Sequence, residues 1–422
     1  MLQRLKFWFV VPSLLLLALW GISVLPGLLV DKTPGFWEWR RTLVVGSGIF
    51  AFAWMSGAML LCLRLPWLES RLGGLDKLYR LHKWLGIGAG ILVFTHWMAE
   101  LLPKSMVRSG WLAAPVRHGG GKGDKSFWVE LAQGAGEWIA YLMLALVILA
   151  LIKRFAYGRF RFTHRLMSLV FLVGVYHALL MLPRELWSQP IGWLVALFAL
   201  IGGAAAVHAL AGRIGQRQRY PARIENWRQR EDGVLEIECH AAAVWPGHRA
   251  GQFLLATFDE REGAHPFTIA TDWNDASKGL TLAIKPLGDY TRALPAALTA
   301  GQNVWLEGPY GAFTFDADAA KAAPQIWVAG GIGVTPFLAR LEALAKTGNG
   351  KANPTTPVEV LRLEALAKTG NGKADIDFFY SIPDARHLPA QLTSLCQAAG
   401  VRLHCRHTQS EGQQPASAII ER

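Results

Sequence analysis

The sequence is poor in charged residues and in cysteine. Charged residues make up 18% of the 422 residues, whereas soluble proteins carry about 25%, and this shortage argues against a chain that is soluble throughout. The four cysteines, Cys62, Cys239, Cys396 and Cys405, form no C-x-x-C motif. A disulfide framework, a cysteine zinc site and an iron–sulfur cluster are therefore disfavoured. Because 52% of the residues are hydrophobic and 18 are tryptophan, disordered and collagen-like chains are excluded as well.

Long uncharged runs are present in the first half of the chain. About 20 apolar residues suffice to cross a bilayer as a helix. Four runs reach that length unaided and two reach it with adjoining residues: Phe7–Val30, Thr42–Leu63, Trp84–Ala99, Trp138–Ile152, Leu166–Pro183 and Ile191–Gly212. The first run is too long for the apolar core of a signal peptide and lacks an A-x-A site, so we expect it to be retained. The chain is therefore predicted to join six membrane spans to a soluble part.

The net charge of +12, from 43 Lys and Arg against 31 Asp and Glu, predicts the orientation of these spans. With the N-terminus inside, the inner ends of the spans carry 16 lysines and arginines, and the outer ends and loops carry nine. Cytoplasmic flanks of membrane helices are enriched in these residues. The N-terminus and the region after Gly212 are therefore predicted to be cytoplasmic. Since topology explains the basic excess, we expect the lipid bilayer as a partner and no nucleic acid.

Four histidines lie within two of the spans, where ionisable side chains are costly and point to function. His82 and His96 are 14 residues apart in the third span, and His164 and His177 are 13 apart in the fifth. Each separation is about 20 Å along a helix. Because these spans run in the same direction, His82 lies level with His164, and His96 with His177. Two histidines facing each other across a helical bundle can ligate one heme iron, so two stacked hemes are predicted.

The rotation of the helices supports this pairing only in part. Fourteen residues return about 40° short of the same helical face, and thirteen miss it by about 140°. We expect His164 at the start of its helix, where tighter 3₁₀ geometry would absorb part of the error. The alternative is that each histidine only hydrogen-bonds a neighbouring helix. That alternative is preferred for the unpaired His208, and His118 is expected to be solvated.

The second half of the chain has a different pattern. Tyr220–Ile224, Val234–Cys239 and Gly251–Phe258 are typical of short strands and indicate a small antiparallel barrel. Farther on, the apolar run Gln325–Ala329 leads directly into GGIGVTPF at 330–337 and a helical pattern through Ala345. A glycine-rich turn between a strand and a helix lets backbone N–H groups approach the phosphates of a nucleotide.

These motifs together resemble the ferric reductase and NADPH oxidase superfamily. The resemblance rests on the histidine spacings, HPFT at 265–268, GPYG at 308–311 and GGIGVTPF, and it covers about residues 40–410. It implies a multidomain fold: a six-helix transmembrane bundle with two b-type hemes, an antiparallel β-barrel FAD domain and an α/β nucleotide-binding domain. The predicted domain bounds are 1–215, 216–318 and 319–422.

The resemblance also implies which residues bind the cofactors. The hemes would be ligated by His82, His96, His164 and His177. The flavin would be held by His265, Pro266, Phe267 and Thr268, and its phosphates contacted by Lys285 and Thr291. The nicotinamide nucleotide would be lined by Gly330, Gly331, Gly333, Val334, Thr335 and Pro336. Arg386, six residues beyond the predicted strand Ile376–Tyr380, either binds the 2′-phosphate of NADPH or is a solvated loop arginine, so NADPH and NADH both stay open.

Two features depart from the family pattern. The segment RLEALAKTGNGKA at Arg340–Ala352 is repeated identically at Arg362–Ala374, which is interpreted as a tandem duplication. An F-C-G-P strand end and a final helix, usual in the family, are missing before Arg422, so the nucleotide domain is expected to be C-terminally incomplete.

The implied function is electron transfer from cytoplasmic NAD(P)H through FAD and two hemes to an acceptor on the opposite face. A flavin converts the two electrons of a hydride into single electrons, and no side chain need act as acid, base or nucleophile. Oxygen, giving superoxide, is the favoured acceptor. A ferric-chelate reductase and a heme subunit that donates electrons to an exported protein are the alternatives, and a proton transporter using the histidines is the most remote. The expected location is a bacterial inner (plasma) membrane.

Overall fold

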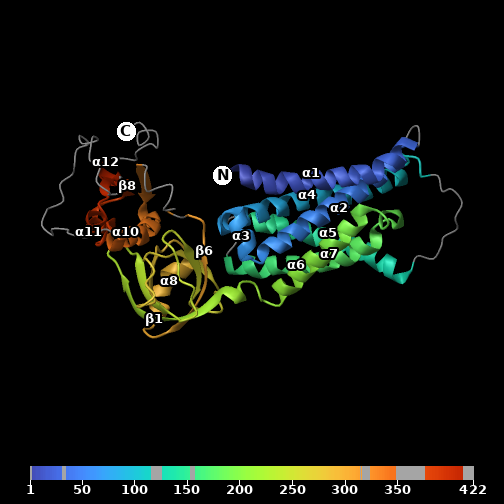
Figure 1. The fold of residues 1–422 in the computed structure, drawn as a ribbon. Helices are drawn as coiled ribbons and strands as arrows, with labels where there is room; N and C mark the ends of the chain where they lie inside the picture. The colour runs from blue at the N-terminus through green and yellow to red at the C-terminus, as the bar shows by residue number, and fades with distance from the viewer. Residues whose placement is uncertain are drawn as a thin grey trace. The chain divides into compact units, whose positions relative to one another are not determined.

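The structure, a computed structural model, describes residues 2–30, 35–115, 126–152, 157–313, 315, 324–347 and 376–411. The chain divides into two compact units, Met1–Gly215 and Gln216–Arg422. Each unit is described separately below (Figure 1). The repeated copy at Arg362–Ala374, His118 and the last eleven residues lie outside the described residues.

The first unit is a bundle of helices. Six of its described helices are long and apolar enough to cross a membrane, as the sequence predicted. They are α1 (Leu2–Val30), α2 (Phe36–Cys62), α4 (Leu75–Arg108), α5 (Phe127–Leu151), α6 (Tyr157–Met181) and α7 (Pro190–Leu210). A short helix α3 (Pro66–Leu72) and a 3₁₀ turn η1 (Arg184–Leu186) complete this unit. The α3 helix starts on a proline and ends at Gly73, whose φ of 82° gives the left-handed cap that reverses the chain.

Two helices begin well before the uncharged runs that predicted them. The α4 helix starts nine residues before Trp84, and α5 starts eleven residues before Trp138. Polar residues continue a helix beyond the apolar segment because the backbone hydrogen bonds close within the helix itself. His164 likewise lies about two turns inside α6, and the whole of α6 is α-helical. The expectation that 3₁₀ geometry at a helix start accommodates His164 is therefore wrong.

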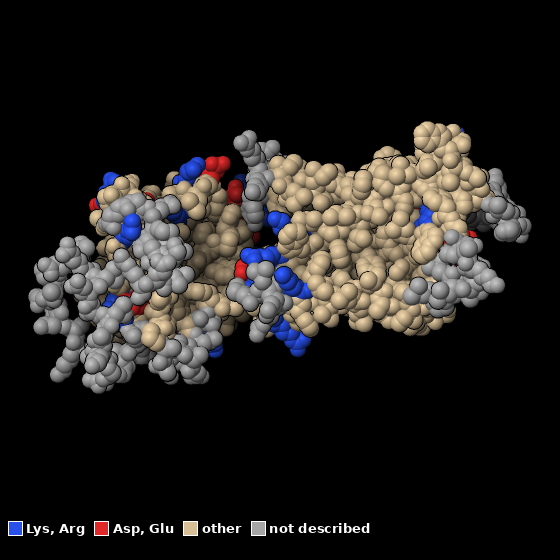
Figure 2. Space-filling model, turned by 90° about the horizontal axis from the view of Figure 1, so that it is seen from above, with Lys and Arg blue, Asp and Glu red and all other residues tan. Residues whose placement is uncertain are grey.

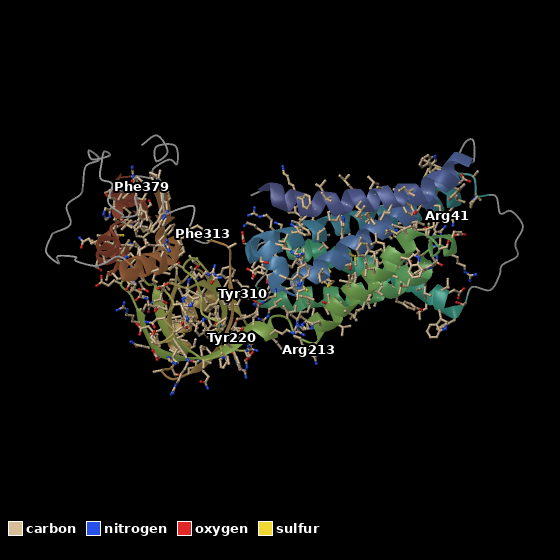
Figure 3. All side chains as sticks on the ribbon, viewed as in Figure 1. Arg41, Arg213, Tyr220, Tyr310, Phe313 and Phe379 are labelled. Carbon is tan, nitrogen blue, oxygen red and sulfur yellow. The ribbon has the colours of Figure 1, made fainter. Side chains whose placement is uncertain are left out.

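The surface of the bundle is apolar along its length. The face seen in Figure 2 is almost free of charged side chains, and Lys and Arg gather at one end of the bundle. Arg41 and Arg213 lie at opposite ends of this unit (Figure 3). Large apolar side chains such as Ile22, Leu200 and Trp193 are about 70% exposed: 69%, 71% and 72%. Such a surface requires a lipid environment, because apolar side chains are normally buried away from water.

The second unit begins with a closed antiparallel barrel. Its strands are β1 (Arg219–Gln229), β2 (Leu235–Ala241), β3 (Phe253–Thr257), β4 (His265–Thr268), β5 (Gly279–Ile284) and β6 (Asn303–Tyr310), in the order β4-β3-β6-β1-β2-β5. The two edge strands meet: Ile269, just after β4, bridges Leu282 of β5, and the Ala270 N–H donates to the Thr281 carbonyl at 2.8 Å. A 3₁₀ turn η2 (Gln216–Gln218) precedes the barrel, and α8 (Asp289–Ala297) follows β5.

Alternation of apolar and polar residues explains the barrel core. Along β2, Leu235, Ile237 and Cys239 face inward and the glutamates between them face outward. Ile224 and Leu306 from other strands are also fully buried in the same core. Inward apolar side chains from every strand therefore stabilise the barrel without a ligand.

The chain then forms a parallel sheet with flanking helices. Strands β7 (Gln325–Gly330), β8 (Ile376–Ile382) and β9 (Arg402–His407) pair in that order. The turn η3 (Gly331–Val334) and α10 (Thr335–Thr347) follow β7, η4 (Ala385–His387) and α11 (Leu392–Ala399) connect β8 to β9, and α12 (Thr408–Glu411) comes last. The predicted combination of a transmembrane bundle, an antiparallel barrel and an α/β part is confirmed.

Candidate functional site

The four membrane histidines meet in two pairs. The rings of His82 and His164 have centroids 5.9 Å apart, and those of His96 and His177 have centroids 6.3 Å apart. These are the pairs expected from the spacing along α4 and α6. The two helices do not pack chiefly against each other: α4 packs mainly on α2, and α6 mainly on α5. The paired histidine side chains therefore reach toward each other from two helices that have few direct backbone contacts.

Three of the four imidazoles are fixed by a backbone carbonyl of a neighbouring helix. Nδ1 of His82 lies 3.0 Å from the Ala58 oxygen, and Nδ1 of His96 lies 2.8 Å from the Val44 oxygen, both on α2. Nδ1 of His177 lies 2.8 Å from the Ala132 oxygen of α5. If Nδ1 carries the proton that it donates to the carbonyl, Nε2 keeps a free lone pair. This arrangement is typical of metal-ligating histidines.

A cavity of about 570 Å³ is lined by both His96 and His177. Ligand pockets usually measure about 300–1,000 Å³. Its wall is mostly apolar and comes from α2, α4, α5, α6 and α7, with Phe52, Met55 and Met143 among the lining residues. The cavity is therefore suited to a large, mostly apolar ligand that contacts both histidines.

Two glycines make room for the histidine rings of this cavity. A Cβ added to Gly136 of α5 would lie 2.3 Å from Cε1 and Nδ1 of His177. A Cβ added to Gly48 of α2 would lie 3.2 Å from Nδ1 of His96. A helix that carried larger residues at these positions would push the rings out of their present places.

The arrangement fits an iron porphyrin better than a bare metal ion. Two metal–nitrogen bonds of about 2 Å, with roughly 1.2 Å from each nitrogen to its ring centre, place the ring centroids about 6.4 Å apart. The 6.3 Å between the His96 and His177 rings agrees, and the 5.9 Å between the His82 and His164 rings is somewhat shorter. Among the described residues no group of three or more His, Cys, Asp or Glu could hold a metal ion. Two protein ligands suffice when a macrocycle supplies the others, as in heme proteins with two axial ligands.

The edge of the cavity carries charged residues. Glu100 and Lys104, from the turns of α4 that follow His96, line it. The Glu100 carboxylate accepts from Arg40 at 2.8 Å and from Lys104 at 2.9 Å. Glu137 of α5 lines the cavity as well. The edge therefore carries charges of both signs, with the Glu100 carboxylate shared by two cations.

In the barrel, the predicted flavin residues lie on an edge strand. Residues His265 to Thr268 form β4 and pair with β3. The bridge to β5 that closes the barrel follows at Ile269. The His265 ring stacks on Tyr290 of α8, with centroids 4.1 Å apart and planes 15° apart. Pro266 is exposed, and Phe267 packs against the barrel core. The HPFT segment and the start of α8 therefore form one aromatic surface.

Tyr290 is the site residue that sequence reasoning missed here. Its hydroxyl oxygen is buried and has no hydrogen-bond partner within the described residues. Burial, followed by the charges of Glu262 and Asp259, raises the pKa of Tyr290 to about 12. A buried hydroxyl without a partner costs about 1–3 kcal/mol, which favours a ligand that hydrogen-bonds it. The clue in the sequence was an aromatic residue next to the predicted phosphate contact Thr291.

The two predicted phosphate contacts have different surroundings. The Thr291 hydroxyl donates to the Gly288 carbonyl and accepts from the Gly288 N–H, both at 3.1 Å, so it caps α8. Its role toward a phosphate stays a prediction. Lys285 follows β5, and its Nζ lies 3.9 Å from a Cβ built on Gly331. This lysine therefore brings a positive charge from the barrel to the glycine-rich turn.

The glycine-rich turn has the predicted strand–turn–helix form. Gly331 has a φ of +51°, which favours glycine, and its carbonyl accepts from the Tyr380 hydroxyl at 2.9 Å. A Cβ at Gly333 would meet nothing within 4 Å, so the backbone is open to a ligand there. Val334 and Thr335 are each only 2% exposed. A nucleotide at this turn would therefore meet their backbone rather than their side chains. Pro336, the second residue of α10, has no N–H in the first turn of the helix.

Arg386 is paired with an acid at the carboxyl end of β8. Its Nη2 and Nε donate to the two carboxylate oxygens of Asp384 at 2.8 and 3.3 Å. This pairing, with a further contact from His387, holds the pKa of Asp384 well below its usual range. Gly330 pairs with Ser381, so Asp384 follows the strand beside the glycine turn. In doubly wound dinucleotide-binding folds, an acid near this place hydrogen-bonds the ribose 2′-hydroxyl of NAD; such a role for Asp384 stays a prediction.

Comparisons with known proteins agree with the transmembrane site. Residues 47–175 match the family described as ferric reductase like transmembrane component. This stretch contains His82, His96 and His164, and His177 lies two residues beyond it. The resemblance of the membrane part to ferric reductases is thereby confirmed, and the chain is an integral membrane protein.

Individual relatives cover smaller parts of the chain. Ferric reduction oxidase 4 of Arabidopsis thaliana is 33% identical over 91 residues, 21% of this chain and 13% of that protein. The reductase component of propane 2-monooxygenase from Mycolicibacterium goodii is 31% identical over 108 residues, 25% of this chain and 29% of that protein. The chain therefore spans less than a third of the length of these curated relatives.

Among solved structures, the ferredoxin-NADP+ reductase of Plasmodium falciparum is similar to 48% of this chain, with 74% of that chain covered. The sequence identity is 16% and the TM-score is 0.35.

Proposed function

We propose that this protein is a membrane-spanning oxidoreductase that moves electrons from a nicotinamide nucleotide to an acceptor on the other side of the membrane. The observation that carries the proposal is the pairing of four histidines at two depths of one helical bundle. The family match over residues 47–175 supports it. The glycine-rich turn between β7 and α10 supplies the nucleotide end.

His96 and His177 would hold one b-type heme, and His82 and His164 a second. Heme iron with two axial histidines accepts and releases one electron at a time. The carbonyls of Val44, Ala58 and Ala132 engage Nδ1 of three rings, so Nε2 would be the nitrogen left to ligate the iron. The mostly apolar wall of the 570 Å³ cavity would limit the access of water to a heme held there.

FAD would lie between the barrel and the glycine-rich turn. The flavin supplies the conversion from a two-electron hydride donor to one-electron acceptors. Tyr290 and His265 offer stacked rings and an unsatisfied hydroxyl to it. Lys285 offers a positive charge to phosphates beside Gly331. These residues bind and orient, and none needs to act as an acid or base.

The orientation and the donor follow from charge. The 16 lysines and arginines on one side and nine on the other support a cytoplasmic second unit, in a bacterial inner membrane. Because the Asp384 carboxylate engages Nε and Nη2 of Arg386 and competes with a 2′-phosphate for this cation, we expect NADH to be the preferred donor. A partner protein is not required for this path.

Two acceptors have support. Oxygen, giving superoxide, is favoured by the sequence resemblance. Because two histidines would take both axial positions of each iron, oxygen would be reduced without binding the iron. A ferric chelate is favoured by the names of two plant relatives, ferric reduction oxidases 4 and 5. Both acceptors would take electrons at the edge of the cavity near Glu100 and Lys104.

The test begins with a dithionite-reduced spectrum of the purified full chain, in which b-type heme bands are expected. His96→Leu should lower the heme content, whereas His208→Gln should not, because His208 bonds only the Arg213 carbonyl at 3.1 Å. A wild-type protein without b-type bands would refute the proposal.

The acceptor is decided with NADH and the same protein in proteoliposomes. Cytochrome c reduction that superoxide dismutase abolishes would support oxygen. Formation of Fe(II) from ferric citrate that the dismutase does not affect would support ferric-chelate reduction.

A further inference from the structure

One of the four heme-pair histidines is held differently from the others. Nδ1 of His164 is buried and has no hydrogen-bond partner within the described part of the chain. His82, His96 and His177 all place Nδ1 within 3.0 Å of a carbonyl oxygen. A ligating histidine without such a partner can rotate about its side-chain bonds and offers a less basic nitrogen.

An aromatic ring takes the place of the missing carbonyl. Phe160 lies one helical turn before His164 on α6, and its ring stacks on the imidazole with centroids 5.0 Å apart and planes 21° apart. The His82 ring meets the same imidazole with centroids 5.9 Å apart and planes at 71°. Stacking of this kind favours one orientation of the imidazole and restricts its rotation.

We propose that Phe160 is a positioning residue for the inner heme, holding the His164 ring in the ligating orientation by stacking instead of by a hydrogen bond. The proposal rests on the proposed function, since it assumes a heme between His82 and His164. It separates the two heme positions: the outer pair is oriented by two carbonyls, and the inner pair by one carbonyl and one aromatic ring. The inner heme is then the more easily lost of the two.

The position of Phe160 allows a matched control. Phe162 lies on the same helix two residues later, and its side chain is 70% exposed, away from the histidines. Phe162→Leu removes an aromatic ring from the same segment without touching His164. Phe160→Leu removes the stacked ring and keeps an apolar side chain of similar volume, and Phe160→Tyr keeps the ring.

The experiment measures heme in the full-length protein purified in detergent. Heme per chain is determined by pyridine hemochrome absorbance, and its retention by the rate of transfer to apomyoglobin. Loss of an orienting partner weakens metal binding by about 10–100-fold. Phe160→Leu is therefore expected to lose one heme of two, with a transfer rate at least tenfold faster for that heme. Phe160→Tyr and Phe162→Leu are expected to retain both.

Electron paramagnetic resonance supplies the readout that a general loss of stability would not produce. The low-spin signal of one heme should change in Phe160→Leu, while the signal of the other stays as in the wild type. If Phe160→Leu keeps two hemes, wild-type transfer rates and both signals, the positioning role is refuted and the heme function stands. If Phe160→Tyr loses heme as Phe160→Leu does, the ring is not the cause, and the positioning role is refuted as well. A wild type without heme would refute both proposals.

Discussion

The contact between Gly136 and His177 provides a sharp test of the outer heme position. In Gly136→Ala the new Cβ would lie 2.3 Å from the imidazole, whereas carbon atoms in contact sit about 3.5–4.0 Å apart. The ring would have to move by roughly 1 Å, and metal–ligand distances tolerate about 0.2 Å. The 2.8 Å contact from Nδ1 to Ala132 would be disturbed by the same movement.

In Gly136→Ala, the expected loss of heme binding runs against the gain in helix stability that alanine brings. Alanine is about 1 kcal/mol more favourable than glycine inside a helix, so α5 itself gains stability. Heme binding at the outer position should nevertheless weaken by about 10–100-fold. Gly134→Ala is the control, because it lies on the same helix and its added Cβ would meet nothing within 4 Å.

The assay compares heme per chain and heme transfer to apomyoglobin in the wild type, Gly136→Ala and Gly134→Ala. Gly136→Ala should hold about half the heme of the other two, while all three elute alike on size exclusion. Equal heme content and equal transfer rates in the two alanine variants would refute the geometry derived for His177.

Three further predictions concern the second unit. Tyr290→Leu should release flavin, because it removes the ring stacked on His265, whereas Tyr290→Phe keeps the ring, loses only the hydroxyl and should release less; flavin fluorescence of the denatured protein measures this. Asp384→Asn should free Arg386 and lower the ratio of KM for NADPH to KM for NADH about tenfold, the effect of roughly 1.4 kcal/mol. Burial lowers the pKa of His248 from 6.5, so its neutral ring contributes stability that is present above pH 6.5 and lost as the pH falls below it. His248→Gln should flatten that dependence in thermal unfolding followed by tryptophan fluorescence.

Each of these has an outcome that contradicts it. Equal flavin in both Tyr290 variants would exclude the stacked pair from the flavin site. An unchanged coenzyme ratio in Asp384→Asn would mean that Arg386 does not reach the nucleotide, and Arg386→Gln should then also have no effect. If His248→Gln lost stability more steeply at low pH than the wild type does, His248 would not be the source of the predicted loss of stability at low pH.

Much of the membrane unit was predictable because the main constraints on it act along the helix axis. A bilayer sets the length of an apolar helix, and a rise of 1.5 Å per residue converts histidine spacing into depth. These two rules predicted six spans and the pairing of His82 with His164 and His96 with His177. The glycine-rich turn was likewise predictable, since Gln325–Ala329 and the helix after it have local patterns.

Rotation about the helix axes was not predictable in the same way. The 13-residue spacing of His164 and His177 misses the same face by about 140° on an ideal helix, yet both rings meet their partners. The helices α4 and α6 each pack on another helix, so the histidines reach across a gap and need not share one narrow stripe. Sequence periodicity describes one helix at a time, whereas the positions of the histidine rings depend on the packing of four helices, α2, α4, α5 and α6.

The sequence by itself determined how many helices cross the membrane, the depths of the histidines and the strand–turn–helix order, because each follows from local pattern and chain geometry. Only the tertiary structure decided what supports those residues. It places Gly136 against His177 and Phe160 against His164, and it stacks Tyr290 on His265. It also pairs Arg386 with Asp384. Such contacts depend on where neighbouring backbones lie in three dimensions, and no periodicity within a single segment encodes them.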